Sequence, residues 1–227
     1  MRNIFKIILL LLIFFSFSCS KEEATVETDE FIKAADMSFL PLIESEGTIF
    51  YNENNIAEDA LLTLKRAGCN TIRIRLWHTP IDNHSGFNEV KNFAQRVKSL
   101  GMKVWLTVHY SDTWADPGSQ IKPQAWNNLT FNQLKIQFES YTSQIVSEIQ
   151  PDIFQIGNEI NNGFIYPEGN LTSNESQFIS LLAAASSVIR SQRPATKIMI
   201  HFAGIGRASW FFSKTAAIDY DLSLIHI

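Results

Sequence analysis

The sequence predicts an α/β fold with a parallel sheet, of the kind that closes into a (β/α) barrel. Three observations indicate this fold. Short apolar segments alternate with amphipathic segments from residue 31 onward, which is typical of parallel strands joined by crossover helices. Polar residues gather where the apolar segments end. No glycine-rich phosphate loop follows the first predicted strand, so a nucleotide-binding sheet has no support.

The first predicted unit begins with a strand at residues 31–38, which ends in Asp36 and Ser38. Residues 57–67 have leucines at helical spacing, and Gly68 ends this helix, as glycine commonly does just past a helix end. We assign the residues between these two segments to a loop.

The second predicted strand, residues 70–77, alternates apolar residues with Arg73, Arg75 and Trp77. A period of two is typical of a strand. Two arginines on one face are costly in an apolar core unless they are paired. This face is therefore expected to line a polar barrel interior or a functional site.

The later units repeat the pattern, with Gly101 ending one helix and Thr130 or Asn132 as a candidate cap for the next. Together these units account for five to six of the eight strand-helix units of a full barrel. The remaining predicted helices lie at residues 87–100, 130–149, 175–192 and 209–217, and the remaining strands at residues 102–108, 151–157, 196–201 and from 219 onward.

Composition favours a globular domain and excludes one class of partner. Apolar residues make up 45% of the chain, enough for a substantial core, and its 17 Phe and 5 Trp offer rings that stack on sugars or fill the core. The net charge is −4 and the basic residues are scattered. A nucleic-acid site requires a basic patch, so we expect no nucleic-acid partner.

The N-terminus predicts export. Residues 1–19 resemble a lipoprotein signal, because basic residues precede an apolar run at 7–15 that is too short to span a membrane, and Cys19 follows as the lipidation site. Residues 20–30 are polar and acidic, typical of a flexible tether. After cleavage only Cys69 remains besides the acylated cysteine, so no intramolecular disulfide is expected.

We therefore expect an exported bacterial lipoprotein of the cell envelope or cell surface. The lipid would be its sole contact with the membrane, and we expect a monomer. The domain organisation predicted is a signal at residues 1–19, a tether at 20–30 and a partial catalytic barrel at 31–227.

Polar side chains at predicted strand ends form the candidate site. In a (β/α) barrel the carboxyl ends of the strands converge on one face, which is the catalytic face. The residues at or just beyond these ends are Asp36, Arg75, Trp77, His109, Asp112, Asn158, Glu159 and His201.

Glu159 is the candidate general acid/base of a glycosidase. Retaining hydrolysis needs two carboxyl groups about 5–5.5 Å apart, one attacking the sugar and one handling the proton. A barrel mouth can desolvate Glu159 and raise its pKa, so that it stays protonated. Asn158 is placed to hold the sugar 2-hydroxyl. Arg75 either orients a carboxylate through its planar fork or forms a buried structural salt bridge.

His109, Asp112 and His201 come singly from separate strand ends, without the tight spacing of metal ligands. We therefore predict no metal and no cofactor, and expect these side chains to bind sugar hydroxyls or to orient carboxylates. Trp114 is a candidate stacking platform for substrate. Trp126 is either a second platform or a ring packed under a long loop.

Two long motifs carry a family resemblance. The run HYSDTWADPGSQIKPQAW at residues 109–126 and the run QIGNEINNG at residues 155–163 resemble the family 53 endo-β-1,4-galactanases, also called arabinogalactan endo-1,4-β-galactosidases. The resemblance covers about residues 32–212. Its supporting pieces are ADMSFLPLIESEG from Ala35, FYNENN from Phe50, LKRAGCNTIRIRLW from Leu64, GMKVWLTV from Gly101 and KIMIHFAG from Lys197.

The resemblance implies a retaining (β/α)8-barrel glycosidase that cleaves internal β-1,4-galactosidic bonds in type I arabinogalactan, the galactan side chains of pectin. It implies that Glu159 is the general acid/base. It also supports substrate or supporting roles for Arg75, His109 and Asn158.

The C-terminal part departs from the family pattern. The family's nucleophile is a glutamate at the end of the seventh strand, whereas this sequence reaches about the sixth, and no glutamate follows Phe212. Residues 222–227 do not continue the family pattern and are expected to be an artefact of a truncated or frameshifted gene. The parent protein is thus expected to be a galactanase, and this polypeptide as written to be inactive.

Two other functions are compatible with the sequence. A related barrel glycosidase acting on β-mannan or cellulose shares the Asn-Glu strand end, and the run at residues 109–126 is what favours galactan over these substrates. A non-catalytic, glycan-binding surface lipoprotein would keep the cleft without the second carboxylate.

Overall fold

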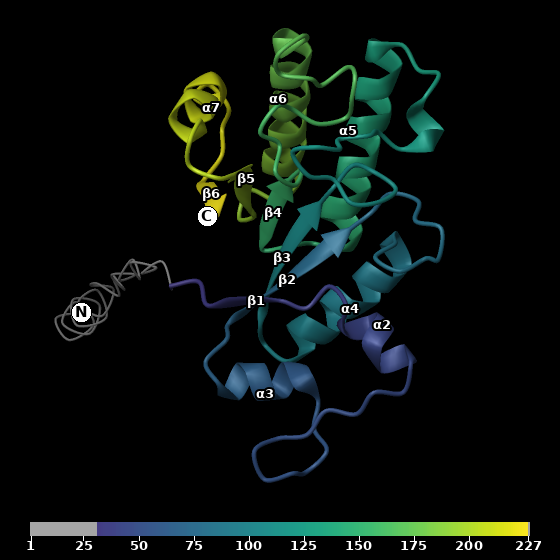
Figure 1. The fold of residues 1–227 in the computed structure, drawn as a ribbon, viewed down its shortest axis with the longest axis vertical. Helices are drawn as coiled ribbons and strands as arrows, with labels where there is room; N and C mark the ends of the chain where they lie inside the picture. The colour runs from purple at the N-terminus through teal and green to yellow at the C-terminus, as the bar shows by residue number, and fades with distance from the viewer. Residues whose placement is uncertain (1–30, 227) are drawn as a thin grey trace, which may run out of the picture. The chain divides into compact units, whose positions relative to one another are not determined.

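The computed structural model describes residues 31–226. Its centre is one sheet of six parallel strands that follow one another in sequence order (Figure 1). This confirms the predicted α/β fold, an incomplete (β/α)8 barrel. The strands are β1 (Ala34–Asp36), β2 (Thr71–Leu76), β3 (Lys103–Val108), β4 (Ile153–Ile156), β5 (Lys197–Ala203) and β6 (Leu222–His226).

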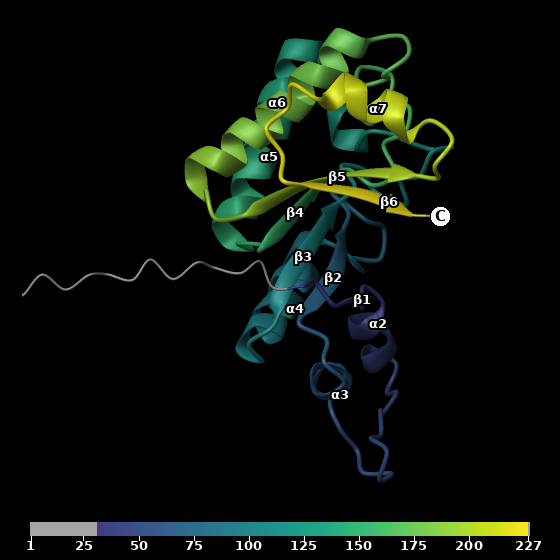
Figure 2. The same ribbon diagram turned by 90° about the vertical axis from the view of Figure 1, so that its left-hand side faces the viewer.

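Helices connect successive strands, as expected when parallel neighbours are joined by crossovers. The long helices α5 and α6 pack side by side (Figure 2). The helices are α2 (Leu40–Ser45), α3 (Ala60–Arg66), α4 (Phe87–Ser99), α5 (Phe131–Glu148), α6 (Glu175–Gln192) and α7 (Ala208–Thr215), with a 3-10 turn η1 (Gln124–Trp126).

The chain between β1 and α3 differs from the sequence prediction. The first strand is shorter than predicted, and the predicted loop after it contains α2. Pro41 lies in the first turn of α2, where the missing N–H removes no intrahelical hydrogen bond. The helix is short and Leu40 is its one buried residue, so its sequence has almost no apolar period to indicate a helix.

Two helix starts show how local side chains set the element bounds. Asp59 accepts a hydrogen bond from the Leu61 backbone N–H at 2.8 Å, so α3 begins later than predicted. Thr130 forms a capping box with Gln133 at the start of α5, which confirms one of the two caps predicted there. Each interaction satisfies a backbone N–H that the helix itself leaves unpaired.

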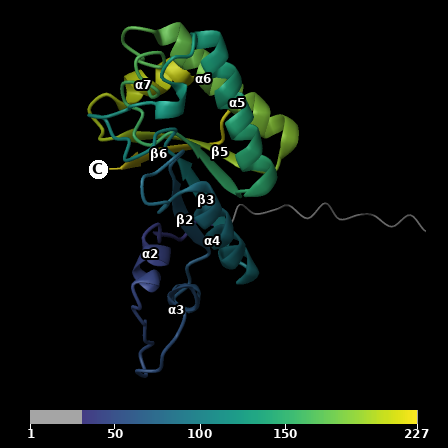
Figure 3. The same ribbon diagram turned by 90° about the vertical axis from the view of Figure 1, so that its right-hand side faces the viewer.

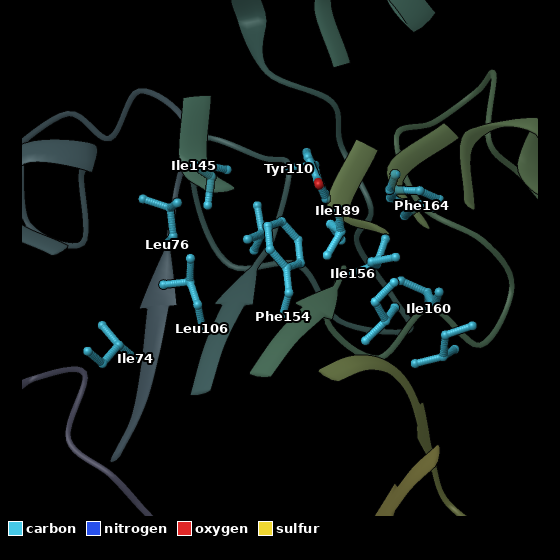
Figure 4. Packing of buried hydrophobic residues seen from close by; sticks show 14 of the residues in the cluster. Ile74, Leu76, Leu106, Tyr110, Ile145, Phe154, Ile156, Ile160, Phe164 and Ile189 are labelled. Atoms are coloured by element: carbon cyan, nitrogen blue, oxygen red, sulfur yellow. The ribbon is translucent and has the colours of Figure 1, made fainter. Parts of the chain in front are cut away.

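One face of the sheet forms the apolar core with α4, α5 and α6. Ile74, Leu106 and Phe154 point from successive strands toward these helices and are buried. Figure 4 shows them beside Ile145 of α5 and Ile189 of α6. Alternate residues on each strand therefore point away from this core, toward the barrel interior.

That interior face is polar, as the alternation in the second strand predicted. The register places Arg73 beside Trp105, and Thr107 beside both Arg75 and Gln155. The carboxyl ends of β2 to β5 lie along one rim of the sheet (Figure 3). Side chains from distant parts of the sequence thus meet on the same rim.

The predicted signal sequence, Cys19 and the predicted tether lie outside the described residues. Within residues 31–226, none of the helices is both long and apolar enough to cross a bilayer. Leu222–His226 forms β6 and pairs in parallel with β5. That residues 222–227 are a gene artefact stays a prediction.

Candidate active site

The chain turns sharply where β4 ends, at Gly157, Asn158 and Glu159. Gly157 has φ +72°, and a Cβ there would lie 2.4 Å from the Ile160 side chain, so the turn requires glycine. Glu159 also has positive φ, at 51°, an uncommon conformation for a residue other than glycine. This turn aims the two polar side chains at the rim of the sheet.

Asn158 is buried and holds the loop after β3. Its Nδ2 donates to the Ala115 carbonyl oxygen at 2.8 Å, and its Oδ1 accepts from Arg73 at 2.9 Å. Arg73 also forms an ion pair with Asp36 at the end of β1. The amide is therefore fixed by the loop after β3 and by Arg73 of β2, which is itself paired with Asp36.

Glu159 is half-buried, with 22% of its side chain exposed. Burial raises its pKa above the usual value, and the charge of Asp116 acts in the same direction. Arg73 opposes this rise, as does His226 in its charged form, without cancelling it. Desolvation disfavours the charged carboxylate, so this position favours the protonated carboxyl group more than solvent does.

His201 lies beneath Glu159 and is neutral. The Glu159 backbone N–H donates to His201 Nδ1 at 3.2 Å, so the ring proton is on Nε2, which lies 2.7 Å from His226 Nδ1. Burial lowers the pKa of His201 to about 3, and the charge of Arg73, with that of His226 in its charged form, adds to this effect. His226 Nε2 in turn lies 3.5 Å from Glu159 Oε1.

The same three side chains, Glu159, His201 and His226, have ligand-type atoms within 4.8 Å of one another. Two ring nitrogens of this group, His201 Nε2 and His226 Nδ1, bond each other, so a metal ion bound through either of them would have to break that hydrogen bond. The other two residues considered as ligands from sequence, His109 and Asp112, do not join this group of three.

Arg75 is buried, 2% exposed, and is surrounded by aromatic rings. Its guanidinium carbon lies 4.3 Å from the ring centres of both Trp77 and Trp114, and 4.6 Å from that of Phe39. Among residues 31–226, none of the ion pairs involves Arg75. Of the two roles predicted for it, a buried salt bridge is therefore not formed.

His109 and Trp114 lie next to Arg75. The Ala115 backbone N–H donates to His109 Nδ1 at 3.0 Å, and the His109 ring meets Trp114 edge to face at 5.6 Å. Burial, with the charges of Arg73 and Arg75 adding to it, lowers the pKa of His109 well below its usual value. His109 is thus a neutral support for the Trp114 loop. Trp114 itself is 48% exposed.

Asp112 and Trp126 lie away from the residues around Glu159. The two Asp112 carboxylate oxygens accept backbone N–H groups of Thr79 and Gln124 at 2.9 and 2.8 Å. Asp112 thereby ties together the loops that follow β2 and β3, and its role in sugar binding stays a prediction. Trp126 is buried and packs against His78 at 5.0 Å, which favours loop packing over a sugar platform.

A cleft of about 270 Å³ runs along this rim. It brings together three of the residues predicted for substrate binding with the predicted acid/base. Its lining consists of Arg73, Trp105, Trp114, Asn158, Glu159, His201, Leu224 and His226. Indole rings beside a carboxyl group are suited to a sugar, because the apolar face of a pyranose stacks on an aromatic ring while a proton donor meets the glycosidic oxygen.

Sequence reasoning missed Arg73 and Trp105 as site residues. Arg73 shares a strand face with Arg75, so the period of two contained its signal. Trp105 can be recognised as a site residue only from the register of the strands, which places it beside Arg73. Its indole N–H donates to Gln155 of the neighbouring strand β4 at 3.0 Å, which helps to fix the position of the ring.

Comparisons with known proteins agree with this geometry. The family model described as Glycosyl hydrolase family 53 matches residues 32–227. The endo-β-1,4-galactanase of Bacillus subtilis (strain 168) is 33% identical over 212 residues, which cover 85% of this chain and 48% of that protein. The chain spans about half the length of the curated relatives it matches.

Two solved structures are also similar. The family 53 catalytic domain of Ignisphaera aggregans aligns with a TM-score of 0.83 and 36% identity, covering 87% of this chain and 59% of that chain. A structure from a study of two fungal β-1,4-galactanases aligns with a TM-score of 0.79 and 30% identity, covering 86% and 63%. With the Asn158–Glu159 strand end and the sequential parallel strands, these matches establish that the chain belongs to glycosyl hydrolase family 53.

Proposed function

We propose that this chain provides the acid/base side of a retaining endo-β-1,4-galactanase site, with Glu159 as the proton donor. The observation that carries the proposal is the position of Glu159 at the end of β4, in a cleft lined by Trp105 and Trp114, with its pKa raised by burial. Galactan is the proposed substrate because the Bacillus subtilis relative is named an endo-β-1,4-galactanase and the motif at residues 109–126 favours it.

In the proposed reaction, Glu159 protonates the glycosidic oxygen while a second carboxylate attacks the anomeric carbon. The glycosyl ester that forms is then hydrolysed by water, and Glu159 removes the proton of that water. A raised pKa suits the first step, because the carboxyl group must be protonated when the bond breaks. The family resemblance assigns the second carboxylate to a seventh strand, and the described sheet has six.

Asn158 is proposed to meet the sugar 2-hydroxyl with the second hydrogen of its Nδ2, since the first is donated to Ala115. Arg73 donates to its Oδ1 and so helps to fix the amide in place. A hydrogen bond to the 2-hydroxyl strengthens as the sugar becomes positively charged. Asn158 would therefore act more strongly on the transition state than on the bound substrate.

The test separates binding from hydrolysis. Calorimetric titration of the full chain with β-1,4-galactotetraose, cellotetraose and mannotetraose measures specificity, and we expect galactotetraose to bind at least tenfold more tightly than the other two. A preference for cellotetraose or mannotetraose would contradict galactan as the substrate. Trp114→Ala is expected to weaken binding, because stacking of a ring contributes about 1 kcal/mol.

Hydrolysis is followed as reducing ends released from β-1,4-galactan. Glu159→Gln keeps the shape of the side chain but has no acidic proton to transfer to the glycosidic oxygen. We therefore expect it to abolish any release of reducing ends while galactotetraose still binds. Release by the wild type that continues undiminished in Glu159→Gln would refute the role of Glu159. Binding without release is what the expected inactivity of this polypeptide predicts, and turnover by the wild type would contradict that expectation.

We further propose export as a monomeric lipoprotein acylated at Cys19, with the polysaccharide as its one partner. The sequence of residues 1–19 supports this proposal. Metabolic labelling with a clickable fatty acid in a bacterial host tests it. Label is expected in the wild type and not in Cys19→Ala, and equal labelling would rule out that site.

A further inference from the structure

The buried guanidinium of Arg75 is balanced through an imidazole. Its Nε and Nη2 donate to Ser85 Oγ at 3.1 and 2.9 Å, and Nη2 also donates to His84 Nε2 at 3.1 Å. Arginine can only donate, so His84 Nε2 accepts and the ring proton is on Nδ1. That Nδ1 lies 2.9 Å from Glu89 Oε1. Glu89, His84 and Arg75 thus form a continuous chain of hydrogen bonds.

Glu89 is fixed independently of this chain. Its Oε1 also accepts the Ser85 backbone N–H at 3.0 Å, and the residue lies in the first turn of α4. A carboxylate is favoured at this end of a helix by the helix dipole. The negative end of the chain of hydrogen bonds is therefore anchored to a regular element, and the positive end reaches the rim of the sheet.

At that rim, Arg75 contacts the exposed ring of the cleft. Trp114 lies 4.3 Å from the guanidinium carbon and lines the same cleft as Glu159. The backbone beside it is held by His109 and Asn158, through the N–H and carbonyl of Ala115. These bonds fix the loop and leave the orientation of the half-exposed indole to its ring contacts. A desolvated cation is attracted by the negative face of a tryptophan ring, more strongly than at an exposed site.

We propose that Glu89 and His84 are positioning residues for Trp114: they hold the Arg75 guanidinium where its face meets the indole, and so set the surface on which a sugar ring stacks. The identity of the stacked sugar rests on the function proposed above. The positioning itself is a property of the free protein. Neither Glu89 nor His84 lines the cleft, so both act through Arg75.

The first experiment uses the free protein. The indole N–H signals of the full chain, labelled with ¹⁵N, are recorded by NMR, and Trp114→Phe identifies the Trp114 signal. Glu89→Ala is expected to shift or broaden that signal and to leave the Trp210 signal in place. Glu89→Gln keeps an acceptor oxygen for His84 and is expected to restore the wild-type signal. Asn88→Ala, an exposed neighbour in the same turn, is the control.

An unchanged Trp114 signal in Glu89→Ala would overturn the proposal. If that variant does not fold, His84→Gln replaces it, because the bond from Ser85 N–H to Glu89 is then kept at the helix start. A Trp114 signal that stays in place in a folded His84→Gln would equally overturn it.

The second experiment is a double-mutant cycle on galactotetraose affinity. Glu89→Ala is expected to weaken binding about fivefold to tenfold in the wild type and to have no further effect in Trp114→Ala, because residues that act as one unit are not additive. Additive losses would overturn the proposal. If the wild type binds no galactotetraose, the proposed function fails, whereas the NMR measurement still decides whether Glu89 positions Trp114.

Discussion

At the scale of single residues, the turn after β4 decides where the proposed acid/base lies. Gly157 allows the chain to turn sharply, and the next two side chains then reach different targets. Asn158 reaches back to the loop after β3, and Glu159 faces the cleft. The orientation of the proposed proton donor therefore depends on a residue without a side chain.

Gly157→Ala should destabilise the fold by about 1–3 kcal/mol, because it combines positive φ with a Cβ 2.4 Å from Ile160. Urea unfolding measures the change. Gly206→Ala is the control, since a Cβ there meets nothing within 4 Å. Equal stabilities of the two variants would show that the turn relaxes without cost.

Arg73→Lys keeps the positive charge at this position but changes the hydrogen-bond geometry, so it tests which of the two holds Asn158. Arginine bonds Asp36 and Asn158 at once through its fork, whereas the single ammonium of lysine cannot reproduce both bonds in the same geometry. We expect galactotetraose to bind about tenfold more weakly, while the melting temperature changes little because Arg73 lies at the edge of the cleft. Unchanged affinity would mean that Asn158 keeps its orientation without Arg73. Arg66→Lys, far from the cleft in α3, is the matched control.

At the scale of elements, a helix start set by neighbouring side chains could be predicted from the sequence, whereas a short helix held mainly by packing could not. The start of α5 was predicted from Thr130, one of the two candidate caps, and the structure adds Gln133 three residues later as the second partner in the cap. The helix α2 was missed because one short turn with a single buried residue leaves almost no apolar period. Sequence patterns report contacts within a few residues, and packing between elements decides the rest.

Thr130→Ala should cost about 1 kcal/mol of unfolding free energy, because the Gln133 backbone N–H loses its partner at the start of α5. Chemical denaturation checks this value. Thr130→Ser retains the hydroxyl and should be close to the wild type. If both substitutions destabilise equally, the methyl group and not the cap is responsible.

The candidate site shows the same limit of sequence reasoning. Glu159 and Asn158 were predicted because they end an apolar strand, and the structure places both on the rim. The partners of Arg75 were not predicted, because His84 and Trp114 come from loops after two different strands. Strand ends can be located from apolar periodicity, whereas the loop conformations that bring such partners together depend on tertiary packing.

At the scale of the whole molecule, buried histidines make stability depend on pH. The pKa of His201 is lowered to about 3, below the usual value of about 6.5. Between these values the unfolded chain binds a proton that the folded protein does not. The stabilisation from neutral His201 is therefore complete above pH 6.5 and is lost as the pH falls toward 3.

We accordingly expect the free energy of unfolding to fall more steeply between pH 6.5 and 4 in the wild type than in His201→Gln. Urea unfolding across this range gives the two slopes. Parallel slopes would mean that His201 is protonated as readily in the folded protein as in the unfolded chain. His78→Gln serves as a comparison, because burial lowers the pKa of His78 while Asp112 opposes this shift.

The order of the sheet has a consequence for how the protein is made. In the described sheet, β2 to β5 each pair with the strands directly before and after them in the chain, and β1 and β6 pair with β2 and β5. A strand leaving the ribosome thus finds its earlier partner already synthesised, and a newly added strand-helix unit needs no later segment for its first pairing. Co-translational folding can therefore proceed from β1 toward β6 by stepwise addition, with each completed unit as the template for the next.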